Sequence, residues 1–311
     1  MTTHTPVLYQ EVLNLLRPQP DGRYVDGTLG AGGHTAGILA ASAPTGRVLG
    51  FDRDPEAIAF ARQRLAEYGD RVLFVNDSYA HMGQIAPQLG FAQVDGILLD
   101  LGLSSRQLDD GARGFSFRQA GPLDMRYDQT QGETAADLLN NRPEIELADI
   151  FWRYGEEKHG RRYAHLIVAN RPFTTTTQLA DLIAAHSGAA RSSQRRRIHP
   201  ATQIFQALRI AVNQELAAVE TGVPAAIELL QPGGRLAVIS FHSLEDRFVK
   251  RLFRQQSQAC PCPPEQPVCT CGGQAALRLI TRKAVQATAA EMENNPRSRS
   301  ARLRVVEKNI L

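Results

Sequence analysis

A glycine-rich run near the start of the chain separates an expected strand from an expected helix. Residues 24–26 have the pattern of a short strand, residues 27–34 read Gly-Thr-Leu-Gly-Ala-Gly-Gly-His, and an apolar helical pattern follows through Ile38 and Leu39. Glycines let a backbone come close to a ligand, and the helix start behind them offers unpaired N–H groups. This order is typical of nucleotide-binding α/β folds, although a glycine-rich turn can equally serve packing alone.

Strands and helices continue to alternate as far as residue 100. Further strands are predicted at residues 47–51, 72–75 and 95–100. Pro55 starts a helix that carries Ile58. The strand at 95–100 is apolar on both faces, as a buried parallel strand requires. Four strands with helices between them predict a doubly wound, Rossmann-like α/β sheet.

The alternation stops after residue 104, and residues 105–199 show helical periodicity without a convincing strand. Their apolar side chains are expected to line the core of a small helical bundle: Leu138, Leu139, Ile145, Leu147, Ile150, Phe151, Leu166, Ile167, Leu179, Leu182 and Ile183. This stretch is therefore predicted to be an inserted helical domain that recognises the substrate.

The sheet pattern returns after a long amphipathic helix that starts at Ala201. Closing strands are predicted at residues 235–239, 277–280 and 302–306, and residues 291–300 read as a loop. We therefore predict one discontinuous domain, residues 1–104 and 200–311, with the insertion at residues 105–199.

The composition is that of an ordinary folded protein, with 43% apolar and 22% charged residues. No run approaches the about 18 consecutive apolar residues that cross a bilayer, and the first residues do not resemble a secretory signal. We therefore expect a cytoplasmic protein with no membrane partner. The sequence leaves the oligomeric state open, and a homodimer is compatible with it.

Basic residues are clustered, although the net charge of +3 is too small to indicate a nucleic-acid partner by itself. Arg195, Arg196 and Arg197 form a basic run that could face the phosphates of RNA. A solvated surface is an equally good interpretation of the same run.

All four cysteines fall in one short segment, at Cys260, Cys262, Cys269 and Cys271. Two C-x-C pairs in a cytosolic chain could hold a structural zinc ion as thiolates. The alternative is a pair of local disulfides formed on oxidation.

Polar residues follow the predicted parallel strands, whose carboxyl ends meet at one edge of the sheet. Asp52 follows the second strand and could accept hydrogen bonds from both hydroxyls of an adenosine ribose, while Asp54 suits the N-cap of the next helix and leaves Asp52 free. Tyr79 could cover one face of an adenine or be an ordinary half-buried tyrosine. Asp100 ends the fourth strand and opens a dense polar run, the main catalytic candidate.

Two other classes of protein could carry these features. A nicotinamide enzyme has a similar sheet and a similar acid after its second strand, but this loop reads Gly-x-Gly-Gly rather than Gly-x-Gly-x-x-Gly. The chain also lacks an evident second substrate domain with its own strands. A non-catalytic RNA-binding or assembly protein would use the same residues only for structure.

Longer motifs carry a resemblance over nearly the whole chain. They include Asp26-Gly-Thr-x-Gly-x-Gly-Gly-His34, Asp95-Gly-Ile-Leu-Leu-Asp-Leu-Gly-x-Ser-Ser105 and Ser240-Phe-His-Ser-Leu-Glu-Asp-Arg247. Further matching runs lie at residues 4–8, 52–55, 107–109, 113–117, 121–126, 203–210, 213–216 and 295–299. With these runs the chain closely resembles the ribosomal small-subunit RNA (cytosine-N4)-methyltransferase family, RsmH, formerly called MraW.

The resemblance implies a Rossmann-like class I methyltransferase sheet with an inserted helical domain. It also implies S-adenosylmethionine-dependent N4-methylation, of EC class 2.1.1, of a cytidine in the decoding region (P site) of 16S rRNA. The small ribosomal subunit or its rRNA is then the partner. The family's cofactor contacts carry over to Gly32, Gly33, His34, Asp52, Tyr79, Asp100 and Gln107. Relatives often have phenylalanine in place of Tyr79, and an aromatic face is kept.

The chemistry needs a group that accepts a proton from the cytosine amine. Amino methyltransferases often have an Asp/Asn-Pro-Pro-aromatic run after the fourth strand, whereas this chain has Asp-Leu-Gly-Leu-Ser-Ser. We assign Asp100 as the acceptor nearest the methyl donor, with Asp109 as the alternative.

A motif after the fifth strand is expected to lie at the same edge of the sheet as Asp52 and Asp100, at the entrance to the predicted site. There, Phe241 or His242 could stack on a base removed from its helix. The equally weighted alternative is a helix cap by Ser243, with Asp246 at the third helical position.

Overall fold

The computed structural model describes residues 6–187, 199–260, 266 and 273–310 of the 311-residue chain. The chain forms two compact units, one made of Met1–Gly102 with Ala217–Leu311 and the other of Leu103–Leu216. The predicted division lay at residues 104/105 and 199/200, whereas the contacts divide the chain at 102/103 and 216/217.

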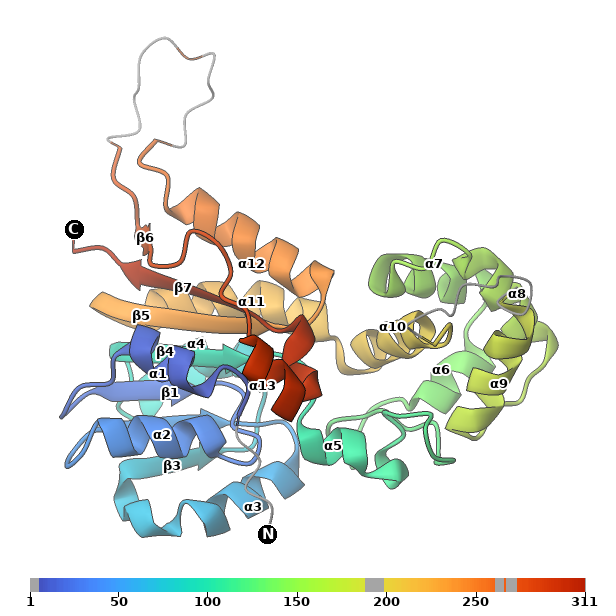
Figure 1. Cartoon of the computed structure of the whole chain (residues 1–311), viewed down its shortest axis with the longest axis horizontal. Helices are drawn as coiled ribbons and strands as arrows, with labels where there is room; N and C mark the ends of the chain where they lie inside the picture. The colour runs from blue at the N-terminus through green and yellow to red at the C-terminus, as the bar shows by residue number, and fades with distance from the viewer. Residues whose placement is uncertain (1–5, 188–198, 261–265, 267–272, 311) are drawn as a thin grey trace. The chain divides into compact units, whose positions relative to one another are not determined.

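A seven-stranded sheet forms the first unit, in the order β3-β2-β1-β4-β5-β7-β6 (Figure 1). The strands are β1 (Arg23–Asp26), β2 (Arg47–Phe51), β3 (Val72–Val75), β4 (Val94–Asp100), β5 (Leu230–Ser240), β6 (Leu277–Leu279) and β7 (Arg302–Lys308). The first five pair in parallel, and β7 runs antiparallel to both β5 and β6. All seven predicted strands are confirmed, and with them the doubly wound α/β sheet.

Helices cover both faces of this sheet because its strands alternate their apolar side chains between two cores. Tyr24 and Leu98 face a core shared with α1 (Tyr9–Leu16), α2 (Gly33–Ala41) and α3 (Pro55–Arg64). Val25 and Ile97 face the other core, shared with α4 (Met82–Gln88), α11 (Glu215–Leu229) and α12 (Ser243–Gln256). Short 3-10 turns are η1 (Ala66–Arg71) and η2 (Tyr79–His81).

Helix ends in this unit test two sequence-based predictions. Asp54 caps α3 as expected, because its Oδ1 accepts the N–H of Glu56 at 3.0 Å. The loop predicted at residues 291–300 is wrong, since α13 (Ala289–Asn294) and η5 (Pro296–Ser300) occupy this stretch. Thr288 caps α13 by accepting the N–H of Glu291, and the good helix formers that follow outweigh the loop signal of the later Asn-Asn-Pro.

The described secondary structure of the second unit is helical, apart from an isolated bridge between Pro122 and Thr175, and residues 114–134 form an irregular stretch. It contains α5 (Ser105–Asp109), η3 (Gly111–Arg113), α6 (Ala135–Asn141), α7 (Glu144–Gly155), α8 (Gly160–Ala169), α9 (Thr176–His186) and α10 (Thr202–Asn213). Its core holds most of the predicted side chains, but Ile145 is 79% exposed, so its predicted core position is wrong. Ile145 lies two residues before the buried Leu147 and therefore on another face of α7.

The long helix expected from Ala201 is interrupted. α10 ends at Asn213, Gln214 takes a left-handed conformation with φ 51°, and α11 begins at Glu215. The buried Asn213 amide accounts for the break: it donates to Met125 O at 2.7 Å and accepts the N–H of Tyr127 at 2.8 Å. Within the described residues, no helix has the length and apolar composition needed to cross a membrane.

An ion pair ties the antiparallel strand β7 to α12 and gives a test of the fold. Asp246 accepts hydrogen bonds from Nε and Nη2 of Arg304 at 2.7 and 3.1 Å, and both side chains are about nine-tenths buried. Asp246→Asn leaves the guanidinium without its countercharge, so we expect the free energy of unfolding to fall by about 3 kcal/mol. Urea denaturation measures this change.

The matched control for this test is an exposed ion pair in the other unit. Glu133 and Arg142 lie 2.8 Å apart, with side chains 37% and 47% exposed, and Glu133→Gln should change stability little. Equal effects of Asp246→Asn and Glu133→Gln would contradict the role given to the buried pair.

Candidate cofactor-binding and catalytic site

Strand order brings the ends of β1, β2 and β4 to one edge of the sheet. β1 lies between β2 and β4 and is parallel to both, so Asp26 stands in register with Gly50 and with Leu98. The chain order of the strands reverses between β1 and β4, which is where open α/β sheets bind ligands. The residues that follow these three strands therefore define the candidate site.

The glycine-rich loop after β1 is fixed to both neighbouring strands. Gly27 donates its N–H to Leu98 O and Leu29 donates to Phe51 O, both at 2.9 Å. Gly32 is the N-cap of α2 with φ 74°, and its N-cap position carries no side-chain hydrogen bond. A Cβ on Gly33 would lie 2.5 Å from Pro6 Cγ, so packing also requires glycine here. The loop is therefore suited both to tight packing and to ligand binding, because the N–H groups at the start of α2 have no side-chain cap.

Asp52 anchors this loop, which the sequence did not predict. Its Oδ2 accepts the N–H of Gly30 at 2.7 Å and its Oδ1 accepts the N–H of Asp54 at 2.9 Å, so the prediction that Asp52 is left free is wrong. Each carboxylate oxygen keeps a second lone pair that can accept a hydroxyl. Burial raises the pKa of Asp52 to about 6, against the lowering effect of these two hydrogen bonds.

His34 and Asp100 face each other with their hydrogen-bonding capacity unused. His34 Nε2 lies 3.8 Å from Asp100 Oδ2, and the His34 ring is buried. Neither ring nitrogen of His34 nor Oδ1 of Asp100 makes a hydrogen bond of good geometry within the described residues, although the backbone of Val7 lies close enough to the His34 ring to raise its pKa slightly against the effect of burial. Unpaired buried polar atoms are costly and uncommon in folded proteins, so a group of three in one place points to a ligand that completes them.

Electrostatics keeps this pair uncharged at neutral pH. Burial lowers the pKa of His34 to about 4. Burial, with the nearby carboxylates of Asp26 and Glu245, raises the pKa of Asp100 to about 8. The Asp100 side chain is 26% exposed as a whole, while its Oδ1 is fully covered. The contact at 3.8 Å therefore joins a neutral imidazole to a largely protonated acid.

Asp26 and Thr28 support the site, and sequence reasoning gave them no role in it. Asp26 accepts the hydroxyl of Thr35 at 2.6 Å and the N–H of Thr28 at 3.1 Å, and burial raises its pKa to about 6. The hydroxyl of Thr28 accepts the N–H of Asp100 at 2.6 Å. Asp26 could have been predicted by the rule that indicated Asp52 and Asp100, because it too is an acid at the end of a parallel strand.

Tyr79 opens η2 and is partly buried. A Cβ on Gly222 of α11 would lie 2.4 Å from Tyr79 Cδ2, so α11 covers one side of the ring. The predicted contact of this ring with adenine stays a prediction.

Phe241 and His242 follow β5 and differ in their surroundings. The Phe241 ring lies beside Gly102, 3.6 Å from where a Cβ of that glycine would stand. His242 is the N-cap of α12 and shares a capping box with Glu245, so the predicted cap by Ser243 is wrong by one residue. The His242 side chain is only 8% exposed, which leaves little of its ring for a base.

The remaining predicted site residues belong to the second unit or to the cysteine-rich segment, and their place in the site stays a prediction. Gln107 and Asp109 belong to the second unit, where Gln107 forms a capping box with Ser104 and Asp109 is exposed at the end of α5. Cys260 is exposed. The other predicted zinc ligands, Cys262, Cys269 and Cys271, lie outside the described residues, as do Arg195, Arg196 and Arg197. The structure thus adds no support for a zinc site.

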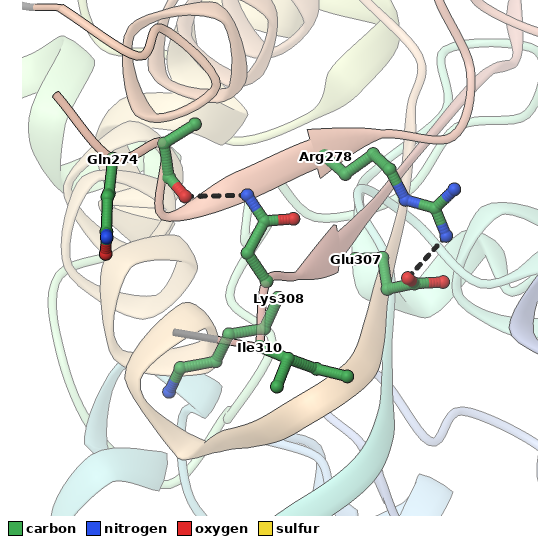
Figure 2. Close-up of a pocket in the computed structure, with 7 residues that line it drawn as sticks. Gln274, Arg278, Glu307, Lys308 and Ile310 are labelled. Carbon is green, nitrogen blue, oxygen red and sulfur yellow. Dashed lines mark hydrogen bonds and ion pairs between the residues drawn. The ribbon is translucent and has the colours of Figure 1, made fainter.

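A separate pocket lies at the opposite edge of the first unit's sheet (Figure 2). Its lining includes Arg278, which pairs with Glu307, and Lys308, which donates to Leu230 O at the amino end of β5. It shares no residue with the strand-end cluster. Ligands of parallel sheets bind at carboxyl ends, so this pocket is not the candidate site.

The sheet order with its antiparallel β7, the glycine loop and the strand-end acids define a Rossmann-like class I methyltransferase fold. A model of the MraW methylase family matches residues 1–309, and the chain belongs to this family. The family assignment confirms the predicted resemblance and removes the nicotinamide enzyme as an interpretation. The protein is a methyltransferase.

Curated relatives agree with this assignment over their full length. One named Ribosomal RNA small subunit methyltransferase H, from Thermomicrobium roseum, is 55% identical over 310 residues, covering 99% of this chain and 94% of the relative. Relatives of the same name from Syntrophobacter fumaroxidans and Heliobacterium mobile are 53% and 50% identical, each covering 98% of this chain and 96% and 98% of the relative.

The raised pKa of Asp100 makes stability depend on pH. Because the native state holds this proton between pH 4 and 8 and the unfolded state does not, Asp100 lowers stability progressively as pH rises through that range. Asp100→Asn removes this dependence, so the free energy of unfolding of the variant relative to the native protein should increase between pH 4 and 8, by up to about 5 kcal/mol at about 1.4 kcal/mol per pKa unit. Urea denaturation at several pH values measures it, and a difference independent of pH would contradict the assigned pKa.

Proposed function

We propose that this enzyme transfers a methyl group from S-adenosylmethionine to the N4 amine of a cytidine in the decoding region (P site) of 16S rRNA. The names of the relatives support small-subunit rRNA as the substrate class. The observation that carries the proposal is the set of buried polar atoms of His34 and Asp100 that make no good hydrogen bond within the described residues, at the carboxyl ends of the paired strands β1 and β4.

The residues around this point suit the cofactor. The uncapped start of α2 at Gly32 and Gly33 offers N–H groups to a carboxylate. Asp52 retains lone pairs for ribose hydroxyls, and Tyr79 supplies an aromatic surface after β3. Gln107, from the second unit, is the remaining contact that the family resemblance implies. When bound, S-adenosylmethionine supplies an electrophilic methyl group on a positively charged sulfur.

Catalysis by the protein consists of positioning and proton acceptance. The lone pair of the cytosine amine is delocalised into the ring, so the amine must be held about 3 Å from the methyl carbon, in line with the bond that breaks. Asp100, as a carboxylate, accepts a hydrogen bond from the amine and then its proton. Asp109 is the alternative acceptor.

Residues that follow β5, and residues of the second unit, bind the RNA on this proposal. Phe241, partly exposed beside Gly102, offers a surface on which a flipped base can stack. Arg195, Arg196 and Arg197 supply positive charge for phosphates. On this proposal the helical unit binds the substrate, and the sheet binds the cofactor.

Removing the acceptor tests the mechanism. Asp100→Asn should lower methylation of small-subunit rRNA by about 10²–10⁴-fold, because an amide cannot take up the proton. Mass spectrometry of rRNA from cells that lack the gene, complemented with each variant, identifies the modified base and its extent. Asp109→Asn tests the alternative acceptor and should retain most activity if Asp100 takes the proton. Full activity of Asp100→Asn would transfer the role to another group.

The basic run gives a second test. Reversing Arg195, Arg196 and Arg197 to Glu should weaken RNA binding, and the loss should shrink as salt rises, because phosphate contacts act through counterion release. Cofactor affinity, measured by isothermal titration, should be unchanged. RNA binding that is equally strong at low salt in the reversed protein would place the phosphate contacts elsewhere.

A further inference from the structure

Asp100 is an acid that faces two other acids and one histidine, and none of these groups is positively charged at neutral pH. The groups that face it come from three elements: Asp26 at the end of β1, Glu245 in the first turn of α12, and His34 in the first turn of α2. Two of these are acids. The third, His34, is a buried imidazole whose pKa is lowered to about 4.

Two arginines of β7, the strand that pairs with β5 beside β4, bind another carboxylate. Arg304 binds Asp246 through two hydrogen bonds, and Nη1 of Arg302 lies 3.6 Å from the same carboxylate. In the described parts of the chain, His34 is the sole ion-pair partner of Asp100. A carboxylate in this position lacks the countercharge that a buried ion ordinarily requires.

From this arrangement we infer that Asp100 distinguishes S-adenosylmethionine from its demethylated product by exchanging a proton. The carboxyl group is neutral in the empty site, loses its proton when the sulfonium enters, and regains one when the methyl group leaves. This inference rests on the proposed function and deepens it, because it makes one side chain both the counterion of the cofactor and the base of the reaction.

The electrostatic basis is the appearance and removal of a single positive charge. A cation within about 4–6 Å lowers the pKa of a carboxyl group by about 1–3 units. Since the pKa of Asp100 is raised to about 8, a shift of this size brings it to between about 7 and 5, at or below neutrality. Asp100 is then an anion only while a cation lies beside it.

The step balances in atoms and charge. The bond between the methyl carbon and sulfur breaks with its electron pair remaining on sulfur, and a bond forms between that carbon and N4. The N4 proton passes to the Asp100 carboxylate. The products are a neutral thioether, a neutral methylated amine and a neutral acid, and the proton leaves to solvent when the next sulfonium binds.

Proton release on binding tests the inference without turnover. Isothermal titration at pH 7, in two buffers of different ionisation enthalpy, counts the protons exchanged with S-adenosylmethionine and with S-adenosylhomocysteine, which differ only in the methyl group and its charge. We expect about half a proton to nine-tenths of a proton more to be released with S-adenosylmethionine, for a pKa lowered by about 1–3 units. Asp100→Asn should abolish the excess, and comparison with this variant removes proton exchange by the ligands themselves.

The native protein supplies an independent measurement in case the variant binds neither ligand. Between pH 6 and 8 its affinity for S-adenosylmethionine relative to S-adenosylhomocysteine should rise, by up to about tenfold per pH unit where the pH lies between the pKa of Asp100 in the S-adenosylmethionine complex and its pKa in the empty site. A pH-independent affinity ratio, or equal proton release with both ligands, would overturn the inference while leaving the methyltransferase intact. Failure of S-adenosylmethionine to bind at any pH would instead contradict the proposed function.

Discussion

Parallel pairing of β1 with both β2 and β4 is the constraint on which the site depends. Because β1 is central, the chain must leave the sheet in opposite directions on its two sides, and a crevice opens where the connections diverge. The hydrogen bonds from Gly27 to β4 and from Leu29 to β2 fix the glycine-rich loop to both neighbouring strands. The positions of Asp52 and Asp100 follow from that placement, since they stand at the ends of β2 and β4.

Three acids, Asp26, Asp52 and Asp100, lose hydration at this edge of the sheet, and they are not compensated equally by hydrogen bonds. Asp26 and Asp52 each accept one hydrogen bond from the glycine-rich loop and one from outside it, and these bonds compensate part of their loss of hydration. Asp100 has no such compensation at Oδ1 within the described residues. The first two carboxyl groups thus hold the loop in shape, and the third is available for chemistry. Native proteins retain unsatisfied buried groups where they serve function.

Much of this arrangement could be predicted from the sequence because it depends on local rules. Strand patterns located β1 to β7, and acids at strand ends indicated Asp52 and Asp100, since parallel strands share an edge. The contact between His34 and Asp100 could not be predicted, because it depends on how α2 packs against the sheet. Helix α13 was missed because its helical preference competes with an Asn-Asn-Pro signal only six residues from its start. The exposure of Ile145 depends on where α7 meets its neighbours, which periodicity alone does not define.

A structure of the protein with S-adenosylhomocysteine bound tests the central claim most directly. The account predicts ribose hydroxyls within hydrogen-bond distance of Asp52, and the thioether sulfur beside His34 and Asp100, between β1 and β4. A ligand bound at another edge of the sheet, or one that leaves the atoms of His34 and Asp100 unpartnered and remote, would contradict it.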